Sequence, residues 1–101
     1  VRAMSRPPIL RRLAQAEFDE AADWYERRQR GRGVAFTAAV RRALAGIAAA
    51  PDTYPEVYAD VREAPVPGYP FAVYYRITPT RVDVLAVFHT SRDPGVWQSR
   101  A

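Results

Sequence analysis

The sequence predicts an α+β fold: an N-terminal strand, an antiparallel two-helix hairpin, a three-stranded antiparallel sheet, and a short C-terminal helix or tail. Apolar residues recur at helical spacing between about residues 15 and 50, and segments rich in β-branched and aromatic residues follow at 71–77 and 81–89. A chain of 101 residues supports one core. We therefore expect a single domain over residues 1–101, with residues 1–8 flexible.

The predicted elements begin with a short strand at residues 9–13, which follows two prolines. A helix is then expected over about residues 15–30, because four apolar residues have the spacing i, i+3, i+4 and i+7. These residues are Phe18, Ala21, Ala22 and Tyr25. Acidic residues in its early turns and arginines in its last turn match the helix dipole.

Two pairs of opposite charge lie four residues apart on this first helix. Asp23 precedes Arg27, and Glu26 precedes Arg30, in the order that favours ion pairing along a helix. We expect both pairs to form.

The second helix is expected to begin near Val34, after the turn Gly-Arg-Gly at residues 31–33. One apolar stripe runs through three turns and consists of Phe36, Ala39, Val40, Ala43, Leu44 and Ile47. Pro51 ends the helix and opens a loop. Because the connection between the helices is short, they are expected to lie antiparallel.

Three strands are predicted in the remainder of the chain, at 60–66, 71–77 and 81–89, and the last two are expected to pair as a hairpin. Simple alternation assigns one side of this hairpin to the core beneath the helices: Phe71, Val73, Tyr75, Ile77, Val82, Val84, Ala86 and Phe88. The other side is expected to be half-exposed, because nothing later in the chain is long enough to cover it: Ala72, Tyr74, Arg76, Arg81, Asp83, Leu85, Val87 and His89.

The charge of the chain comes from arginine alone. The net charge is +4, and all 15 basic residues are arginines, so an anionic partner is expected. Cysteine is absent and histidine occurs once, so we expect no metal site, no cofactor and no thiolate chemistry. No apolar run is long enough to span a membrane, and the N-terminus lacks the apolar segment of a secretory signal, so a cytoplasmic location is expected.

The residues that could carry chemistry are few. His89 closes the last strand and Arg92 follows three residues later, so an imidazole could move protons beside a guanidinium that stabilises a phosphorane-like charge. Arg62 on an earlier strand could bring further positive charge to this face. These three are the catalytic candidates if the protein cleaves RNA. The alternative interpretation is that His89 is a hydrogen-bonded residue at the end of a strand.

Several stretches together resemble the RelE/ParE superfamily of toxins from bacterial type II toxin–antitoxin modules. They are "AEFDEAADWYE" on the first helix, "DVREAPVPGYPFAVYYRI", and "VDVLAVFHTSRDPGVWQSR" near the C-terminus. The resemblance runs from about residue 9 to residue 100. It implies a cytoplasmic growth inhibitor that a cognate antitoxin neutralises within a toxin–antitoxin hetero-oligomer.

The superfamily divides by target. RelE-like members cut mRNA on the translating ribosome, and ParE-like members inhibit DNA gyrase. Arg92 matches a functional arginine of the nucleases, but their central strand starts with an arginine where this chain has Ala72. Lysine is absent, and Trp97 stands in place of their C-terminal tyrosine. The resemblance therefore favours gyrase inhibition, with ribosome-dependent mRNA cleavage as the alternative and a non-toxic basic nucleic-acid-binding module as the second alternative.

The half-exposed sheet face is the expected antitoxin-binding surface. Arginines would pair with acidic residues of the antitoxin, and apolar side chains would be covered by it. The residues expected to bind are Tyr74, Arg76, Arg81, Leu85, Val87 and Trp97.

Overall fold

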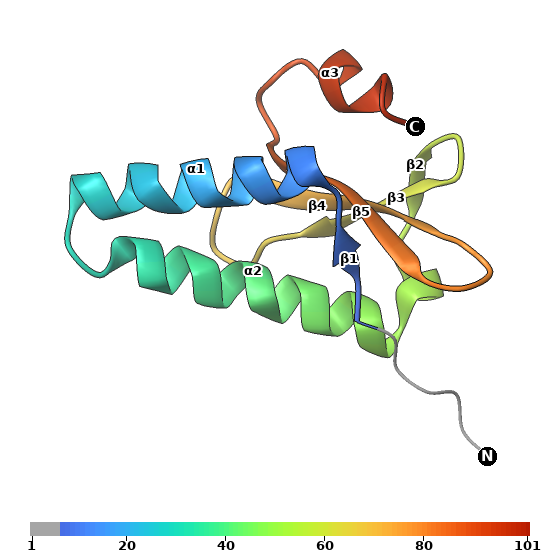
Figure 1. Cartoon of the computed structure of the whole chain (residues 1–101), viewed down its shortest axis with the longest axis horizontal. Coiled ribbons are helices and arrows are strands. Elements are labelled where there is room, and N and C mark those ends of the chain that lie inside the picture. Colours follow the sequence, from blue (N-terminus) through green and yellow to red (C-terminus); the bar gives the residue numbers. More distant parts are fainter. Residues whose placement is uncertain (1–6) are drawn as a thin grey trace.

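A five-stranded sheet with two long helices on one face and a short helix on the other forms the body of the protein (Figure 1). This computed structural model describes residues 7–101; residues 1–6, most of the stretch expected to be flexible, lie outside the described residues. The elements are β1 (Ile9–Leu10), α1 (Arg12–Arg28), α2 (Arg32–Ala49), η1 (Pro51–Thr53), β2 (Glu56–Tyr58), β3 (Val61–Pro65), β4 (Phe71–Ile77), β5 (Val82–His89) and α3 (Gly95–Gln98).

The predicted fold class and the order of its elements are confirmed, but the sheet has five strands rather than three. Its strand order is β1-β5-β4-β3-β2, with β1 parallel to β5 and the other neighbours antiparallel. β1 joins the sheet through only two residues, because the helix begins at Arg12. β2 lies in the segment expected to be a loop. Its turn into β3 places Ala59 at φ 51°, without the glycine that would indicate a hairpin.

The turn between α1 and α2 is held by a carboxylate rather than by the expected ion pairs. Glu26 accepts hydrogen bonds from the backbone N–H groups of Gly31, at 3.0 and 3.1 Å, and Gly33, at 2.9 Å. The predicted Glu26–Arg30 pair is therefore wrong, and no Asp23–Arg27 pair forms among the described residues. Glu26 instead satisfies free donors at the start of α2. A Cβ at Gly33 would meet the Ala22 carbonyl at 2.7 Å, so the helices need glycine here.

A β-bulge in β5 changes which residues face the helices. Tyr74 pairs with Ala86 and Tyr75 pairs with Val84, so Leu85 is one extra residue in β5. Beyond this point the alternation is reversed, because an inserted residue shifts every later side chain to the opposite face. The prediction from simple alternation is therefore correct only before the bulge.

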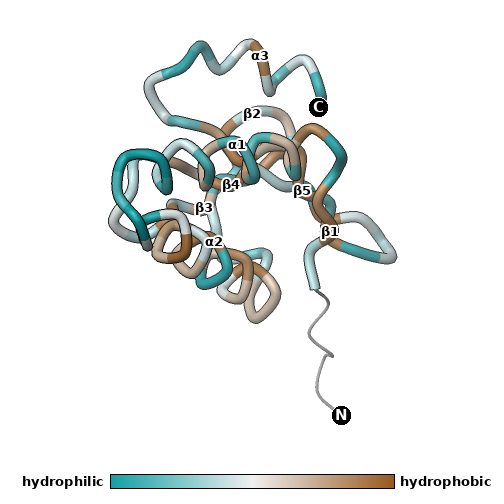
Figure 2. Tube along the Cα trace, turned by 60° about the vertical axis from the view of Figure 1, so that its left-hand side comes forward, coloured by the Kyte–Doolittle hydropathy of each residue, from teal (hydrophilic) through white to brown (hydrophobic). Residues whose placement is uncertain are grey.

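Two apolar clusters result, one on each face of the sheet. Ala86 and Phe88, which were expected beneath the helices, lie on the far face in the cluster that contains Trp97. Val87, expected on the half-exposed face, packs instead in the cluster beneath α1 and α2. In Figure 2, hydrophobic residues predominate along β5, whereas hydrophobic and hydrophilic residues alternate along the two long helices.

The far face is covered by α3, so the prediction that it stays open is wrong. Trp97 is 3 % exposed and stacks on Tyr74, with ring centroids 4.1 Å apart and an angle of 18° between the planes. The ring of Tyr58 meets Trp97 edge-on at 6.0 Å. Trp97, carried on a four-residue helix, belongs to the buried cluster of this face and so helps to cover it.

Tyr75 joins the sheet to the end of α2. Its ring is fully buried, and its hydroxyl donates a hydrogen bond to the carbonyl of Pro51 in η1. Burial raises the pKa of Tyr75 to about 12, because the phenolate would lose its hydration.

Replacing Tyr75 with Phe is expected to lower the free energy of unfolding by about 1 kcal/mol at pH 7, since one buried hydrogen bond is lost. The unfolded tyrosine loses its proton near pH 10 and the folded one near pH 12, so its stabilising contribution falls as pH rises through this window. Urea denaturation at pH 7, 9 and 11 measures the free energy of unfolding. Between pH 9 and 11 this free energy should fall by about 1 kcal/mol less in Tyr75→Phe than in the wild type. An equal fall in the variant and the wild type would contradict this role of Tyr75. Exposed Tyr58→Phe is the control and should match the wild type.

Candidate protein-binding groove

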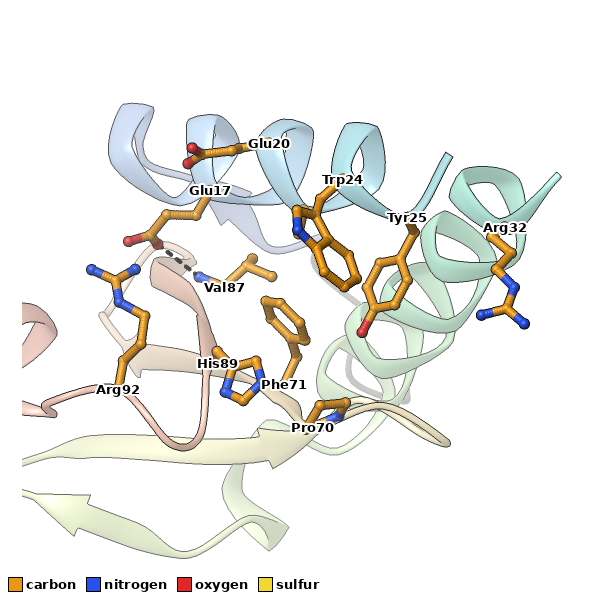
Figure 3. A pocket seen from close by; sticks show the side chains of 11 residues that line it. Glu17, Glu20, Trp24, Tyr25, Arg32, Pro70, Phe71, Val87, His89 and Arg92 are labelled. Carbon is orange, nitrogen blue, oxygen red and sulfur yellow. Dashed lines mark hydrogen bonds between the residues drawn. The ribbon is translucent and has the colours of Figure 1, made fainter. Parts of the chain in front are cut away.

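A groove of about 590 Å³ runs between α1, the ends of β4 and β5, and the loop that follows β5 (Figure 3). Its lining residues are Glu17, Glu20, Ala21, Trp24, Tyr25, Arg32, Pro70, Phe71, Val87, His89 and Arg92. Aromatic and apolar side chains occupy the middle, an arginine lies at each end, and two glutamates, Glu17 and Glu20, lie on the α1 side. This arrangement suits a partner with an apolar side chain between acidic ones.

The aromatic side chains of the groove support one another. Trp24 is 46 % exposed and meets Tyr25 edge-on at 5.1 Å, while Tyr25 lies 6.3 Å from Phe71. Burial, and to a smaller extent Tyr69, raises the pKa of the Tyr25 hydroxyl, so it remains a hydrogen-bond donor at neutral pH. The middle of the groove is thus a preformed aromatic surface with one polar donor.

His89 lies on the floor of the groove because the bulge turns it there. Its ring meets Phe71 edge-on at 5.1 Å. Its Nδ1 atom accepts the backbone N–H of Ser91 at 3.1 Å and lies 2.7 Å from the Ser91 hydroxyl. A neutral imidazole whose Nδ1 accepts a hydrogen bond carries its proton on Nε2. His89 is therefore arranged as a donor through Nε2 rather than as a base.

Both arginines at the ends of the groove lack a carboxylate partner within residues 7–101. The Arg92 guanidinium lies 4.3 Å above the centroid of the Phe88 ring, which fixes its plane and leaves its N–H groups free. Arg92 points toward Glu17 in Figure 3, but that carboxylate is already paired with another arginine. Arg32 occupies the opposite end, in the first turn of α2.

The wall of the groove is held by an ion pair that sequence reasoning did not find. Arg100 binds Glu17 through two hydrogen bonds of 2.8 and 3.1 Å, and each side chain is 15 % exposed. Arg100 also donates to the Leu85 carbonyl at 3.0 Å, and Glu17 accepts the Val87 N–H at 3.1 Å. The pair therefore provides hydrogen-bond partners for backbone groups at the outer edge of β5, beside the bulge. No local sequence signal connects two residues 83 positions apart.

The structure brings together two of the three catalytic candidates. His89 and Arg92 both line the groove, whereas Arg62 does not. Arg62 donates to the carbonyls of Asp52, at 3.1 Å, and Tyr54, at 2.6 Å, so its guanidinium holds the end of η1 in place. This is a structural role.

Among the six residues expected to bind the antitoxin, the apolar ones are buried. Tyr74 and Leu85 pack with Trp97 of α3 in the cluster on the far face, and the Tyr74 hydroxyl donates to Glu63 at 2.8 Å. Val87 faces the groove instead. These side chains form no continuous exposed surface in this structure.

The two arginines of that set are engaged in ion pairs. Arg76 binds Asp60 through three contacts of 2.8 to 3.0 Å, and these hydrogen bonds lower the pKa of the Asp60 carboxyl. Arg81 lies 2.6 Å from the buried Asp83, which Arg11 also approaches at 3.5 Å. Arg76, on β4, and Arg81, just before β5, are therefore held by contacts within the protein.

Neither a metal site nor a membrane span occurs in the part of the chain that the structure describes. No three acidic or histidine side chains of residues 7–101 are grouped as metal ligands, and none of the described helices is both long and apolar enough to cross a bilayer.

A helical hairpin packed on one face of a mostly antiparallel sheet, with a groove along α1, is the arrangement expected of small RelE/ParE-like toxins. A family model described as "ParE toxin of type II toxin-antitoxin system, parDE" matches residues 9–94. The chain belongs to the ParE toxin family. A solved structure titled "Chromosomal ParDE TA system from P. aeruginosa" has the same fold, with a TM-score of 0.76, 14 % identity, and coverage of 88 % of this chain and 100 % of that chain. A comparison with curated proteins finds no match.

Replacing Arg100 with Gln is expected to lower the free energy of unfolding by about 3 kcal/mol, because Glu17 is left largely buried without its counter-charge. Urea denaturation followed by circular dichroism measures this. The matched control is Arg92→Gln, which removes an exposed guanidinium that lies over an aromatic ring and is expected to cost less than about 1 kcal/mol. Equal small losses in both variants would show that the ion pair does not hold the groove.

Proposed function

We propose that this protein is a growth-inhibiting toxin that binds and inhibits DNA gyrase, and that a cognate antitoxin neutralises it. Membership of the ParE family is the observation that carries this proposal. The groove supports it because its chemistry is that of a binding surface: one exposed and two half-buried aromatic side chains in the middle, and at the ends two arginines without a carboxylate partner among the described residues. The proposed site of action is the cytoplasm, where gyrase works on the chromosome.

We propose the groove as the surface that the antitoxin covers. Acidic side chains of the antitoxin would pair with Arg32 and Arg92, and an apolar side chain would pack on Trp24 and Phe71. This replaces the sheet face expected from the sequence, whose apolar residues are buried under α3. A toxin–antitoxin hetero-oligomer follows from this proposal.

Cleavage of mRNA on the ribosome is the second candidate, and one observation favours it. His89 and Arg92 lie in one groove, as a histidine and an arginine would in a ribonuclease. Two observations weigh against it: the accepting nitrogen of His89 is already occupied by Ser91, and Arg62 is bound to backbone carbonyls. Gyrase inhibition therefore remains the leading proposal.

Purified wild-type toxin is expected to inhibit gyrase supercoiling of relaxed plasmid. If the groove binds gyrase, Trp24→Ala should raise the concentration needed for half inhibition by about tenfold or more, because an exposed aromatic side chain at the centre of an interface contributes strongly to binding. Ile77→Ala is the matched control: it truncates another partly exposed apolar side chain, at the far end of β4, and should leave inhibition unchanged.

Unchanged supercoiling at high molar excess of the toxin would contradict gyrase inhibition. New mRNA ends within translated codons, mapped within minutes of inducing the toxin, would then support the nuclease. In that case His89→Ala and Arg92→Ala should abolish the new ends.

A further inference from the structure

Four arginines surround the turn between α1 and α2, which we call the hairpin tip (residues 27–32). Arg27 and Arg28 lie in the last turn of α1, Arg30 lies in the connection, and Arg32 begins α2. All four are exposed, and within residues 7–101 none has a carboxylate partner. Figure 1 shows the tip at one end of the molecule, away from the sheet.

Helix stability explains only two of these arginines. Arg27 and Arg28 lie at the C-terminal end of α1, where a cation interacts favourably with the helix dipole. Arg32 lies at the N-terminal end of α2, where a cation is unfavourable, and Arg30 lies outside both helices. Of the acidic residues nearest the tip, Glu26 is occupied by the N–H groups of the turn, and Asp23 forms no ion pair with these arginines among the described residues. The tip thus keeps more positive charge than the fold requires.

One guanidinium at the tip is already oriented. The Arg28 guanidinium lies 4.2 Å from the centroid of the Trp24 ring. Stacking on an indole fixes the plane of the group and leaves its N–H edge free for two parallel hydrogen bonds, a geometry that phosphate oxygens match. Ordering this side chain before binding lowers the entropy lost on binding.

We propose that the hairpin tip binds the phosphate backbone of DNA. Arg27, Arg28 and Arg30 make the contacts, with Arg32 beside them. A phosphate backbone requires charge and hydrogen-bond donors on a projecting surface, but no apolar core. An acidic protein segment would need apolar contacts as well. The large exposed apolar side chains near the tip are Val34 and Trp24, and Arg28 already lies over the Trp24 ring. The inference goes beyond gyrase inhibition and does not depend on it.

Fluorescence anisotropy with a labelled 20-base-pair duplex of mixed sequence, over 50–200 mM salt and without gyrase, tests this proposal. The variant is Arg27→Gln/Arg28→Gln/Arg30→Gln. The control, Arg12→Gln/Arg41→Gln/Arg42→Gln, removes the same charge from three exposed arginines elsewhere on α1 and α2. The tip variant should raise the dissociation constant about tenfold or more and reduce the salt slope by roughly 2 to 3, while the control should change the constant less than about threefold.

Equal weakening by the two triple variants would overturn the proposal, because net charge alone would then explain binding. Displacement of the duplex by polyglutamate as readily as by unlabelled DNA would also overturn it, since the tip would then be a surface for acidic protein. All six substitutions are at exposed positions, and circular dichroism of each variant checks that the fold is kept. Supercoiling inhibition is measured separately, so the failure of either proposal leaves the other standing.

Discussion

The ion pair between Glu17 and Arg100 is the interaction on which the rest of the structure depends. It lies at the outer edge of β5, where β1 has ended and no further strand satisfies the backbone. Glu17 accepts the Val87 N–H and Arg100 donates to the Leu85 carbonyl, so the two side chains take the place of a missing strand. One interaction therefore joins α1, β5 and the C-terminal residues.

The bulge beside this ion pair determines what each face of the sheet presents. The extra residue, Leu85, turns Val87 and His89 toward α1, where they become part of the groove. It turns Phe88 to the opposite face, where the side chain belongs to the cluster around Trp97 and the Arg92 guanidinium lies over its ring. A regular strand would bury these residues differently, and the groove would lose part of its floor.

Much of the fold could be predicted from the sequence, and the parts that could not have identifiable physical causes. The helices follow from the repeat of apolar residues, and β4 and β5 follow from their composition. The strands β1 and β2 are too short to show alternation. Nothing local distinguishes Leu85 from any other apolar strand residue, so the two faces were assigned wrongly beyond it. At the site, residue type alone indicates His89 and Arg92 as candidates. The roles of Glu17 and Trp24 in the groove come from tertiary contacts, which the sequence does not show.

If partners bind in the groove, as we propose, α3 stays on the far face of the sheet when they bind. The two tryptophans report on these surfaces separately, because Trp24 lines the groove and Trp97, on α3, is buried against the far face of the sheet. The most direct test is fluorine NMR of the protein labelled with 5-fluorotryptophan, with and without its antitoxin, the signals being assigned from Trp24→Phe. We predict that the Trp24 signal shifts and the Trp97 signal stays in place. A shift of Trp97 with Trp24 unchanged would contradict the account, since α3 would then leave the sheet and expose the opposite face.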